Sequence, residues 1–561
     1  MVTNGLERTF RLLLETANEA AVPVLLPALD APDPAIQEEA FQTMLERHQG
    51  ASQQVLIERW HRLTERWRLQ VAQHPGWVAR AVRSAIFHPD PAVCANGCDA
   101  LLYIREFELI PTLVAGIEEV NNPHAPLLAQ TLLSLSELLQ EEIAGPRDKP
   151  RLQDPVRICD QVLPSIERAV ERYARHRCRE AVEAFLVLAG SENPVLKQVL
   201  AEPRHPAYLV LVDILRTSPR MAIIRLVLNL LESRLAPPVA MHVVAHRTDM
   251  PFVRKLLSRI GDAMPDALRA NLRRVDAVDW LQDSLHLLDT LTEKEQAAAV
   301  ALAVSSNMNR LCAFEVLKHV LTSGRTAARR VAAAALADFG GAEANQLAVQ
   351  GVQDPDPQVQ ASMVVQLRDR GIPGAISQLI HLLDSRHAVV REAAQSCLTE
   401  FNFGRYITAF DLMDEKIRSS TGMLVMRIDP HATGALADEL KSRTRTRRLR
   451  GLEAAVAMDA VPLVEPLIIA LLGDPDHFVR SEAARALAYC NTPLALQSLQ
   501  EARHDRSAAV RDAAEQSLRK LSADGTMTTA GSWITALQEL EDSPLIDPLA
   551  TDAGPGKEGV W

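Results

Sequence analysis

Apolar residues recur along most of this chain with the spacing of amphipathic helices. The clearest stretch is 461–520, where apolar side chains return every three or four positions in successive segments separated by short turns. That spacing places the apolar residues of each segment on one face of a helix, so the stretch predicts pairs of amphipathic helices joined by turns. Neither helix of a pair could bury its apolar face alone. Stacking of successive pairs would make one continuous core.

The same stretch contains an internal repeat. Val479-Arg480 recurs as Val510-Arg511, a displacement of 31 residues. The same displacement relates Pro462 to Pro493, Ala483 to Ala514, and Leu487 to Leu518. A fixed period of this length is typical of a solenoid, in which each helix pair packs only on its neighbours.

These residues resemble a known repeat. The order Pro, apolar helix, Asp-Pro turn, Val-Arg, Ala-Ala, Leu is similar to the HEAT repeat, in particular the short type of bacterial HEAT-like proteins related to phycobilisome lyases. In that family the turn Asp and an Arg six residues later form a ladder of hydrogen bonds between repeats. Asp474 with Arg480 and Asp505 with Arg511 match this spacing. The resemblance implies a structural ladder, but the family includes scaffolds, chromophore lyases, a di-iron hydroxylase and DNA glycosylases, so it does not choose a function.

The repeat pattern divides the chain into five segments. They are N-terminal helical repeats at 1–142, a Pro-rich loop at 143–156, degenerate helical repeats at 157–320, regular HEAT-like repeats at 321–521, and an acidic tail at 522–561. We therefore expect an all-α, right-handed α-solenoid of about a dozen helix pairs. The tail has seven acidic residues against Lys557 alone and is rich in Gly, Thr and Pro, so we expect it to be disordered.

One repeat inside the regular segment departs from the period. The helix that begins at Arg448 follows Val390 by 58 residues, where two periods would give 62. The shortened repeat between them, 402–430, and the residue just before it include closely spaced aromatic residues, although the chain is only 4% aromatic. These residues are Phe401, Phe403, Tyr406 and Phe410. Two interpretations stay open: the rings fill the core around an irregular joint, or they line a pocket for a ligand or partner.

The amino-acid composition limits the classes of function that this protein can have. The chain is 47% apolar, which is ample for a large core, and its net charge of −11 argues against a dedicated nucleic-acid binder. Its seven cysteines are dispersed, which is typical of buried apolar residues in a reducing compartment. We expect no secretory leader, and the sequence contains no run of 18 consecutive apolar residues. We expect a cytoplasmic protein without a membrane partner.

The sequence contains few residue patterns that are typical of catalytic or metal-binding sites. The sequence contains no Walker A, GxSxG or HExxH motif, and none of its sixteen histidines is followed by Glu. The di-iron hydroxylases of the family use His-Glu pairs as metal ligands, so that activity does not carry over. His242 with His246, and Cys94 with Cys98, are each spaced i, i+4, but no second pair completes a structural zinc site. We expect no catalytic residue, no metal and no cofactor.

The segment that differs most from the residue types of the repeat is KSRTRTRRLR at 441–450. Its basic residues are Lys441, Arg443, Arg445, Arg447, Arg448 and Arg450, and it contains no acid. In the 31-residue register Arg443 replaces Asp474 and Leu449 replaces Arg480, so we expect this repeat to lack the ladder. The cations would also crowd a helix N-terminus, where the dipole disfavours each by about 0.3–1 kcal/mol. Either this is a solvated turn, or it binds an acidic partner.

The tail contains one apolar stretch, SWITALQELEDSPLIDPL, at 532–549. Trp533, Leu537 and Leu540 would lie on one face of a short helix, with acidic residues alongside. That pattern is typical of a groove-binding peptide. The stretch is either inert or docks on a groove, which belongs to a partner or lies beside residues 443–450 of its own chain.

These patterns favour a non-catalytic scaffold or adaptor that binds an unidentified protein partner. The candidate contacts are the basic residues of 441–450 and the three apolar residues of the tail. One alternative is an enzyme related to the lyases or hydroxylases of the fold. Another is a HEAT-type nucleic-acid binder that uses the basic residues, which the net charge makes less favoured. The sequence does not indicate an oligomeric state.

Overall fold

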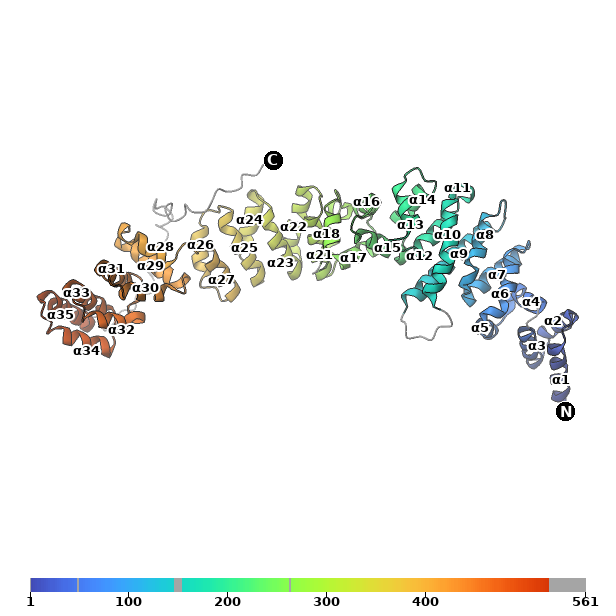
Figure 1. Ribbon diagram of the computed structural model, residues 1–561, viewed down its shortest axis with the longest axis horizontal. Coiled ribbons are helices and arrows are strands. Elements are labelled where there is room, and N and C mark those ends of the chain that lie inside the picture. Colours follow the sequence, from blue (N-terminus) through green and yellow to red (C-terminus); the bar gives the residue numbers. More distant parts are fainter. Residues whose placement is uncertain (1, 48–49, 146–153, 262–263, 524–561) are drawn as a thin grey trace. The chain divides into compact units, whose positions relative to one another are not determined.

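The computed structural model describes residues 2–47, 50–145, 154–261 and 264–523 (Figure 1). These residues form 35 α-helices and six 3-10 helices, with no strand among them. The all-α helical-repeat fold expected from the sequence is confirmed. The helices outnumber a dozen pairs, in part because the degenerate segment contains one-turn helices such as α19 (Asp279–Gln282) and α20 (His286–Asp289).

The chain forms two compact units, the first ending at Val316 and the second beginning at Leu317. The first unit contains α1 (Val2–Glu15), α2 (Val22–Leu29), α3 (Pro34–Glu46), α4 (Gly50–Glu58), α5 (Glu65–Ala72), α6 (Pro75–Ile86), α7 (Pro91–Ile104), α8 (Ile110–Glu118), α9 (Ala125–Ala144), α10 (Pro155–Glu171), α11 (Tyr173–His176), α12 (Arg179–Leu188), α13 (Pro194–Ala201), α14 (Tyr208–Thr217), α15 (Met221–Leu231), α16 (Pro238–His246), α17 (Met250–Ile260), α18 (Asp266–Leu272), α19, α20 and α21 (Glu293–Ser305). Its 3-10 helices are η1 (Glu19–Ala21), η2 (Trp60–Arg62) and η3 (Phe107–Leu109).

The second unit consists of helix pairs. The boundary at residue 316 falls within α22 (Arg310–Ser323), and the helices that follow are α23 (Thr326–Ala335), α24 (Ala342–Gly351), α25 (Pro357–Asp369), α26 (Ala375–Leu382), α27 (Ala388–Cys397), α28 (Phe403–Ala409), α29 (Glu415–Ile428), α30 (Ala432–Leu440), α31 (Arg445–Ala457), α32 (Val461–Leu471), α33 (His477–Ala486), α34 (Pro493–Ala502) and α35 (Ala508–Ala523). Its 3-10 helices are η4 (Leu336–Asp338), η5 (Phe410–Leu412) and η6 (Leu487–Tyr489). Helix α35 continues two residues into the segment assigned to the tail, and the rest of that segment lies outside the described residues.

Asp residues in the turns set where the second helix of a pair begins. Asp33 and Asp90 each cap a helix by accepting a hydrogen bond from the backbone N–H two residues later, at 2.9 Å. In both helices Pro occupies the first position, where its missing N–H costs nothing. Asp476 caps α33 in the same way through the N–H of Phe478, at 2.8 Å. The turn aspartates Asp33, Asp90 and Asp476 therefore mark helix starts.

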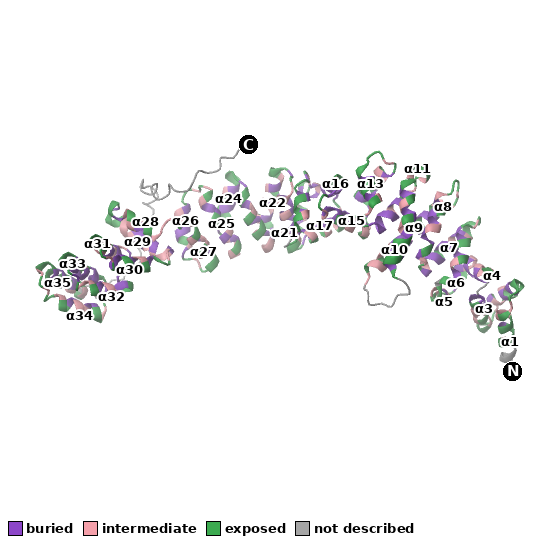
Figure 2. Ribbon diagram, viewed as in Figure 1, coloured by how far each residue is buried: buried purple, intermediate pink, exposed green. Residues whose placement is uncertain are grey.

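The core follows the repeat register. Val479, Ala483 and Leu487 are fully buried, and so are Val510 and Ala514 one period later. Figure 2 shows buried residues on the helix faces that meet neighbouring helices and exposed residues on the outer faces. None of the described helices has the length and apolar character needed to cross a membrane.

The aromatic residues of the shortened repeat fill the core. Phe403, Tyr406 and Phe410 are buried, and the rings of Tyr406 and Phe410 meet edge to face with centroids 5.5 Å apart. The Tyr406 hydroxyl donates to the Arg418 carbonyl at 2.9 Å, and burial raises the pKa of this hydroxyl. The core-filling interpretation is confirmed. These three rings line no open pocket because their side chains are covered.

Candidate partner-binding surface

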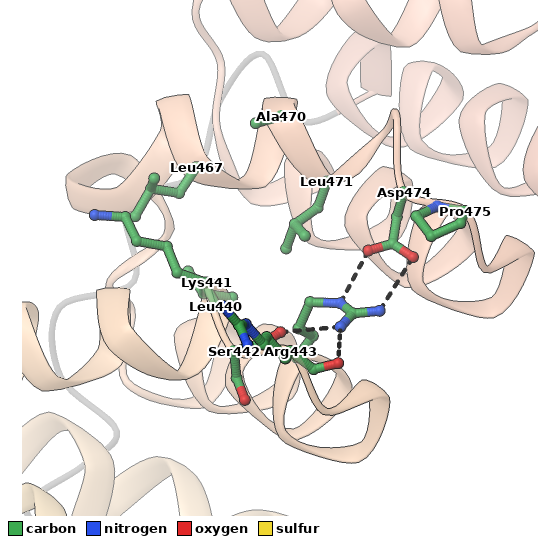
Figure 3. Close-up of a pocket in the computed structure, with 10 residues that line it drawn as sticks. Leu440, Lys441, Ser442, Arg443, Leu467, Ala470, Leu471, Asp474 and Pro475 are labelled. Atoms are coloured by element: carbon green, nitrogen blue, oxygen red, sulfur yellow. Dashed lines mark hydrogen bonds and ion pairs between the residues drawn. The ribbon is translucent and has the colours of Figure 1, made fainter.

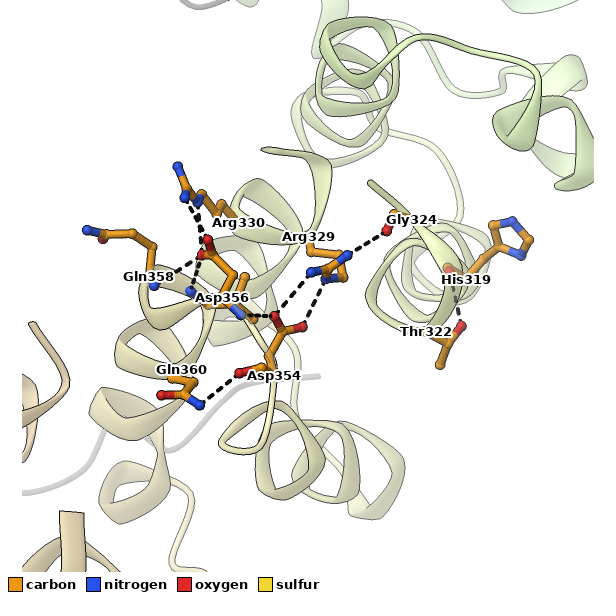
Figure 4. Close-up of polar contacts among 10 residues, drawn as sticks. His319, Thr322, Gly324, Arg329, Arg330, Asp354, Asp356, Gln358 and Gln360 are labelled. Carbon is orange, nitrogen blue, oxygen red and sulfur yellow. Dashed lines mark hydrogen bonds and ion pairs between the residues drawn. The ribbon is translucent and has the colours of Figure 1, made fainter. Parts of the chain in front are cut away.

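A ladder of arginine–aspartate ion pairs joins successive helix pairs in the second unit. Arg480 donates from Nε to Asp505 Oδ2 at 2.9 Å and from Nη2 to Oδ1 at 3.0 Å. Arg329 makes the same two-pronged contact with Asp354, at 2.9 and 3.2 Å (Figure 4). The hydrogen bonds from Arg480 hold the pKa of Asp505 below its usual range. The side chains thus pair across repeats, as the resemblance implied.

Within one repeat the ladder arginine contacts only the backbone of its own turn. Arg480 donates from Nη1 to the carbonyl of Asp474 at 2.8 Å, and Arg511 makes the equivalent bond to Asp505 at 2.8 Å. The Asp and Arg that stand six residues apart in the sequence are therefore held together through a carbonyl, while each carboxylate is free to meet the preceding repeat.

The expectation that the repeat containing 441–450 lacks the ladder is wrong. Arg448 Nε lies 2.9 Å from Asp474 Oδ2, and Nη2 donates to Oδ1 at 3.2 Å (Figure 3). Its Nη1 donates to the carbonyls of Ser442 and Arg443 at 2.9 and 3.0 Å. Arg448 precedes Arg480 by 32 residues, one more than the period, so the strict register assigned the ladder position to Leu449.

Three further cations of the basic cluster have acidic partners. Arg447 donates to both carboxylate oxygens of Glu439, at 2.9 and 2.6 Å, and these bonds raise the pKa of the Arg447 guanidinium. Arg445 Nε lies 3.1 Å from Asp476 Oδ2, and Arg450 pairs with Asp411. Most of the cluster is therefore neutralised within the chain.

The expected penalty at the helix N-terminus is also corrected by these contacts. The cations in the first turns of α31 face carboxylates, whose attraction offsets the unfavourable helix dipole. Lys441 is the C-terminal cap residue of α30, where the dipole favours a cation. These ion pairs and the dipole of α30 therefore explain why most of the cations at 441–450 do not destabilise the repeat.

Lys441 and Arg443 remain exposed, and neither pairs with an acid among the described residues. Both line a hollow of about 410 Å³ at the C-terminal ends of α30 and α32 and the turns that follow them (Figure 3). Its apolar wall includes Leu440, Leu467 and Leu471. Two unpaired cations beside an apolar wall can receive a carboxylate that is flanked by an apolar side chain.

The other sequence candidates lie in the first unit or beyond the described chain. His246 Nδ1 lies 2.9 Å from Asp279 Oδ2, and the His242 ring is 4.4 Å from that of His246. Burial and the neighbouring His246 lower the pKa of His242. Across the described ranges, no three His, Cys, Asp or Glu side chains are grouped to hold a metal ion. The tail candidates Trp533, Leu537 and Leu540 lie outside the described residues.

Two segments of the second unit, 314–399 and 435–519, match the family of HEAT repeats. The second unit therefore contains HEAT repeats. The two matches flank the repeat of α28 and α29, where the aromatic core replaces the ladder. HEAT solenoids typically act as protein-interaction scaffolds that bind partners on extended surfaces.

Solved structures with similar helical folds include a Kap95p complex with RanGDP, at 12% identity over 92% of this chain and 70% of the other, with a TM-score of 0.26. Kap121p matches at 12% identity over 99% of this chain and 78% of its own, with a TM-score of 0.23. An engineered protein matches at 17% identity over 49% of this chain and 99% of its own, with a TM-score of 0.18. At these values the similarity carries no argument about function. No curated protein matches the sequence significantly.

Proposed function

We propose that this HEAT-repeat protein is a non-catalytic scaffold that binds a protein partner at the hollow between α30 and α32. One observation carries the proposal: Lys441 and Arg443 have no acidic partner within the described ranges, in a cluster whose other four cations have one. Both unpaired cations face the same hollow as Leu467 and Leu471. The partner segment that fits carries a carboxylate next to an aliphatic or aromatic side chain.

The pairing of the cluster also weighs against the nucleic-acid alternative. A phosphate-binding surface needs several free cations, because each neutralised phosphate adds to affinity. Here Arg445, Arg447, Arg448 and Arg450 are already held by carboxylates. A single carboxylate needs only the two cations that remain.

Charge reversal in the full-length protein tests the proposal. Proteins cross-linked to the wild-type chain in its native cell are identified, and the main partner is then purified for binding assays. Lys441→Glu with Arg443→Glu should weaken its binding at least tenfold, since two attractive contacts become repulsive. The matched control is Arg80→Glu with Arg83→Glu on α6, which makes the same change in net charge at two exposed arginines. It should leave binding unchanged.

Three results would contradict the proposal. Equal loss of binding in both variants would show that net charge, not the hollow, is recognised. Unchanged binding after reversal at the hollow would place the partner elsewhere. Salt-sensitive binding of single- or double-stranded nucleic acid that is lost only in the hollow variant would favour the nucleic-acid alternative.

Two finer assignments belong to the same proposal. The 31-residue spacing of Val359 and Val390, and of Val479 and Val510, supports the short repeat type related to phycobilisome lyases. All seven cysteines are free thiols, which supports a reducing compartment such as the cytoplasm. Stoichiometric iron or zinc in the purified protein would contradict the non-catalytic assignment and favour an enzyme of this fold.

A further inference from the structure

The last helix pair, α34 and α35, leaves a ladder arginine without a carboxylate. Arg480 is 3% exposed and binds Asp505. Its equivalent one period later, Arg511, is exposed and bonds to the Asp505 carbonyl, and it pairs with no acid among the described residues. The Nε and Nη2 groups of Arg511 therefore have no acidic partner among the described residues, at the position where Arg329, Arg448 and Arg480 each bind an aspartate.

Apolar side chains of the last pair are also left partly uncovered. Leu487 and Cys490 are 0% and 2% exposed, whereas their equivalents Leu518 and Leu521 are only partly buried. On the first helices, Glu465 hydrogen-bonds forward to the next pair through Thr492. Its equivalent on α34 is Leu496, an apolar residue that is partly exposed. The surface that a following first helix would cover thus contains three partly exposed leucines, Leu496, Leu518 and Leu521, beside the exposed polar residues Gln500 of α34 and Arg503 at its C-terminal cap.

The face that a following second helix would cover is charged instead. In α33, Ser481 and Ala484 are buried against α35, and Ser481 donates to the Ala509 carbonyl at 3.3 Å. Their equivalents in α35 are Asp512 and Glu515, both exposed. A helix packed on α35 as closely as α35 packs on α33 would bury these carboxylates, which is strongly unfavourable. The end of the stack therefore accepts one more helix of the first type and excludes a complete pair.

The chain that follows α35 contains one segment with the spacing of such a helix. The buried faces of α32 and α34 have apolar residues at i, i+4 and i+7, followed three residues later by the ladder aspartate. In α32 these are Val464, Ile468, Leu471 and Asp474; in α34 they are Ala495, Leu499, Ala502 and Asp505. The tail repeats this spacing with Trp533, Leu537 and Leu540, and Asp542 follows two residues after Leu540.

We infer that residues 532–540 of the same chain dock as a single capping helix on α34 and the C-terminal turns of α35, with Asp542 in the turn that follows, as Asp474 follows α32 and Asp505 follows α34. The apolar face of the segment covers Leu496, Leu518 and Leu521, and the carboxylate of Asp542 completes the rung with Arg511. The connection 524–531 can span up to about 26 Å at roughly 3.3 Å per residue, which is enough to return along a helix of this length. The seven acids of the tail complement the exposed cations Arg511 and Lys520. This cap is independent of the hollow at Lys441.

Hydrogen exchange in the full-length chain tests the cap. Trp533→Ser, Leu537→Ser and Leu540→Ser together should speed exchange about tenfold or more in residues 518–523 and 533–540, because the apolar contacts that protect both segments are lost. The control Thr535→Ser with Gln538→Ser changes the opposite face of the same helix and should leave exchange unchanged. Unaltered exchange in the apolar variant would overturn the inference.

The charged rung is tested separately by a double-mutant cycle. Arg511→Gln and Asp542→Asn should each speed exchange in residues 533–540 by about 1.4- to 5-fold, the range for an exposed ion pair. The two changes together should have no larger effect than one alone. Independent, multiplying effects would remove the rung from the inference. Protection that falls when the protein is diluted would show that a second copy, not the same chain, supplies the segment.

Discussion

Arg448 binds the carboxylate of Asp474 with Nε and Oδ2 2.9 Å apart, although it stands one residue outside the register of the other ladder arginines. Both side chains are largely shielded from water, with 13% and 6% of their surfaces exposed. The contact continues the ladder from α31 through α33 to α35, since Arg480 binds Asp505 in the next step. The last three helix pairs are therefore joined by side-chain rungs as well as by their core.

Removing Arg448 should destabilise the protein because Asp474 would keep a buried charge without a partner. We expect Arg448→Ala to lower the free energy of unfolding by about 3 kcal/mol, measured by urea denaturation. The matched control is Arg443→Ala in the same turn, whose exposed side chain has no acidic partner among the described residues. It should change stability by less than about 0.5 kcal/mol. Equal effects would mean that the rung at Asp474 does not form.

The ladder should also make stability depend on pH. Arg480 lowers the pKa of Asp505 below the usual value of 3.8. A carboxylate whose pKa is depressed by folding contributes stability above its unfolded pKa, and the contribution is lost as the pH falls through the lower, folded value. Asp505→Asn should therefore lower the urea midpoint at pH 6, and its difference from wild type should shrink below pH 3.8. A difference that stays constant down to pH 2 would contradict this assignment.

Gly422 lies where α29 approaches its neighbours closely. A Cβ there would be 2.7 Å from the Tyr406 hydroxyl oxygen and 3.2 Å from the Ala457 carbonyl oxygen. Gly422→Ala should cost about 1–3 kcal/mol through overpacking, more than the gain of about 1 kcal/mol in helix propensity. Gly434→Ala on α30 meets nothing within 4 Å and should stabilise by up to about 1 kcal/mol. Thermal unfolding of the two variants should show opposite changes in stability. Stabilisation by both substitutions would show that α29 can shift enough to accommodate the added Cβ.

The charged outer face of α35 should keep the protein from stacking on itself. Asp512→Ser, Glu515→Ala and Arg519→Ala introduce the residue types found at the equivalent positions of α33 and η6. The variant should associate as its concentration rises, because small side chains allow close helix packing. Light scattering measures the molar mass. The control Glu501→Ala with Arg506→Ala removes the same kinds of charge elsewhere and should not associate; association of both would point to lost solubility.

The fold could be predicted from the sequence because each repeat contacts mainly its neighbours. Spacing alone placed Val479, Ala483 and Leu487 on a buried helix face. The recurrence of this pattern after 31 residues predicted that successive helix pairs stack. The same repeat pattern placed Asp-Pro turns between the helices. It failed at Arg448, since one inserted residue shifts the ladder position while leaving the helix pattern almost unchanged.

The candidate site was harder to predict because it depends on which charges find partners. Arg447 and Glu439 are eight residues apart across a turn, a separation that a helix pair brings together and that the sequence could have indicated. Arg450 and Asp411 are 39 residues apart, and Asp411 lies in the shortened repeat, where no period could be extrapolated. The candidate surface could therefore be identified only from the structure, in which Lys441 and Arg443 have no acidic partner among the residues described.

The carboxylates of Asp512 and Glu515 have a consequence for how this chain can change in length. A duplicated helix pair inserted after α33 would meet small residues such as Ala484 on the side it packs against. The same duplication appended after α35 would meet charges in place of those small residues. Gene duplication can therefore lengthen this stack from its interior, whereas a new pair can be added directly after α35 only if these charges are replaced first.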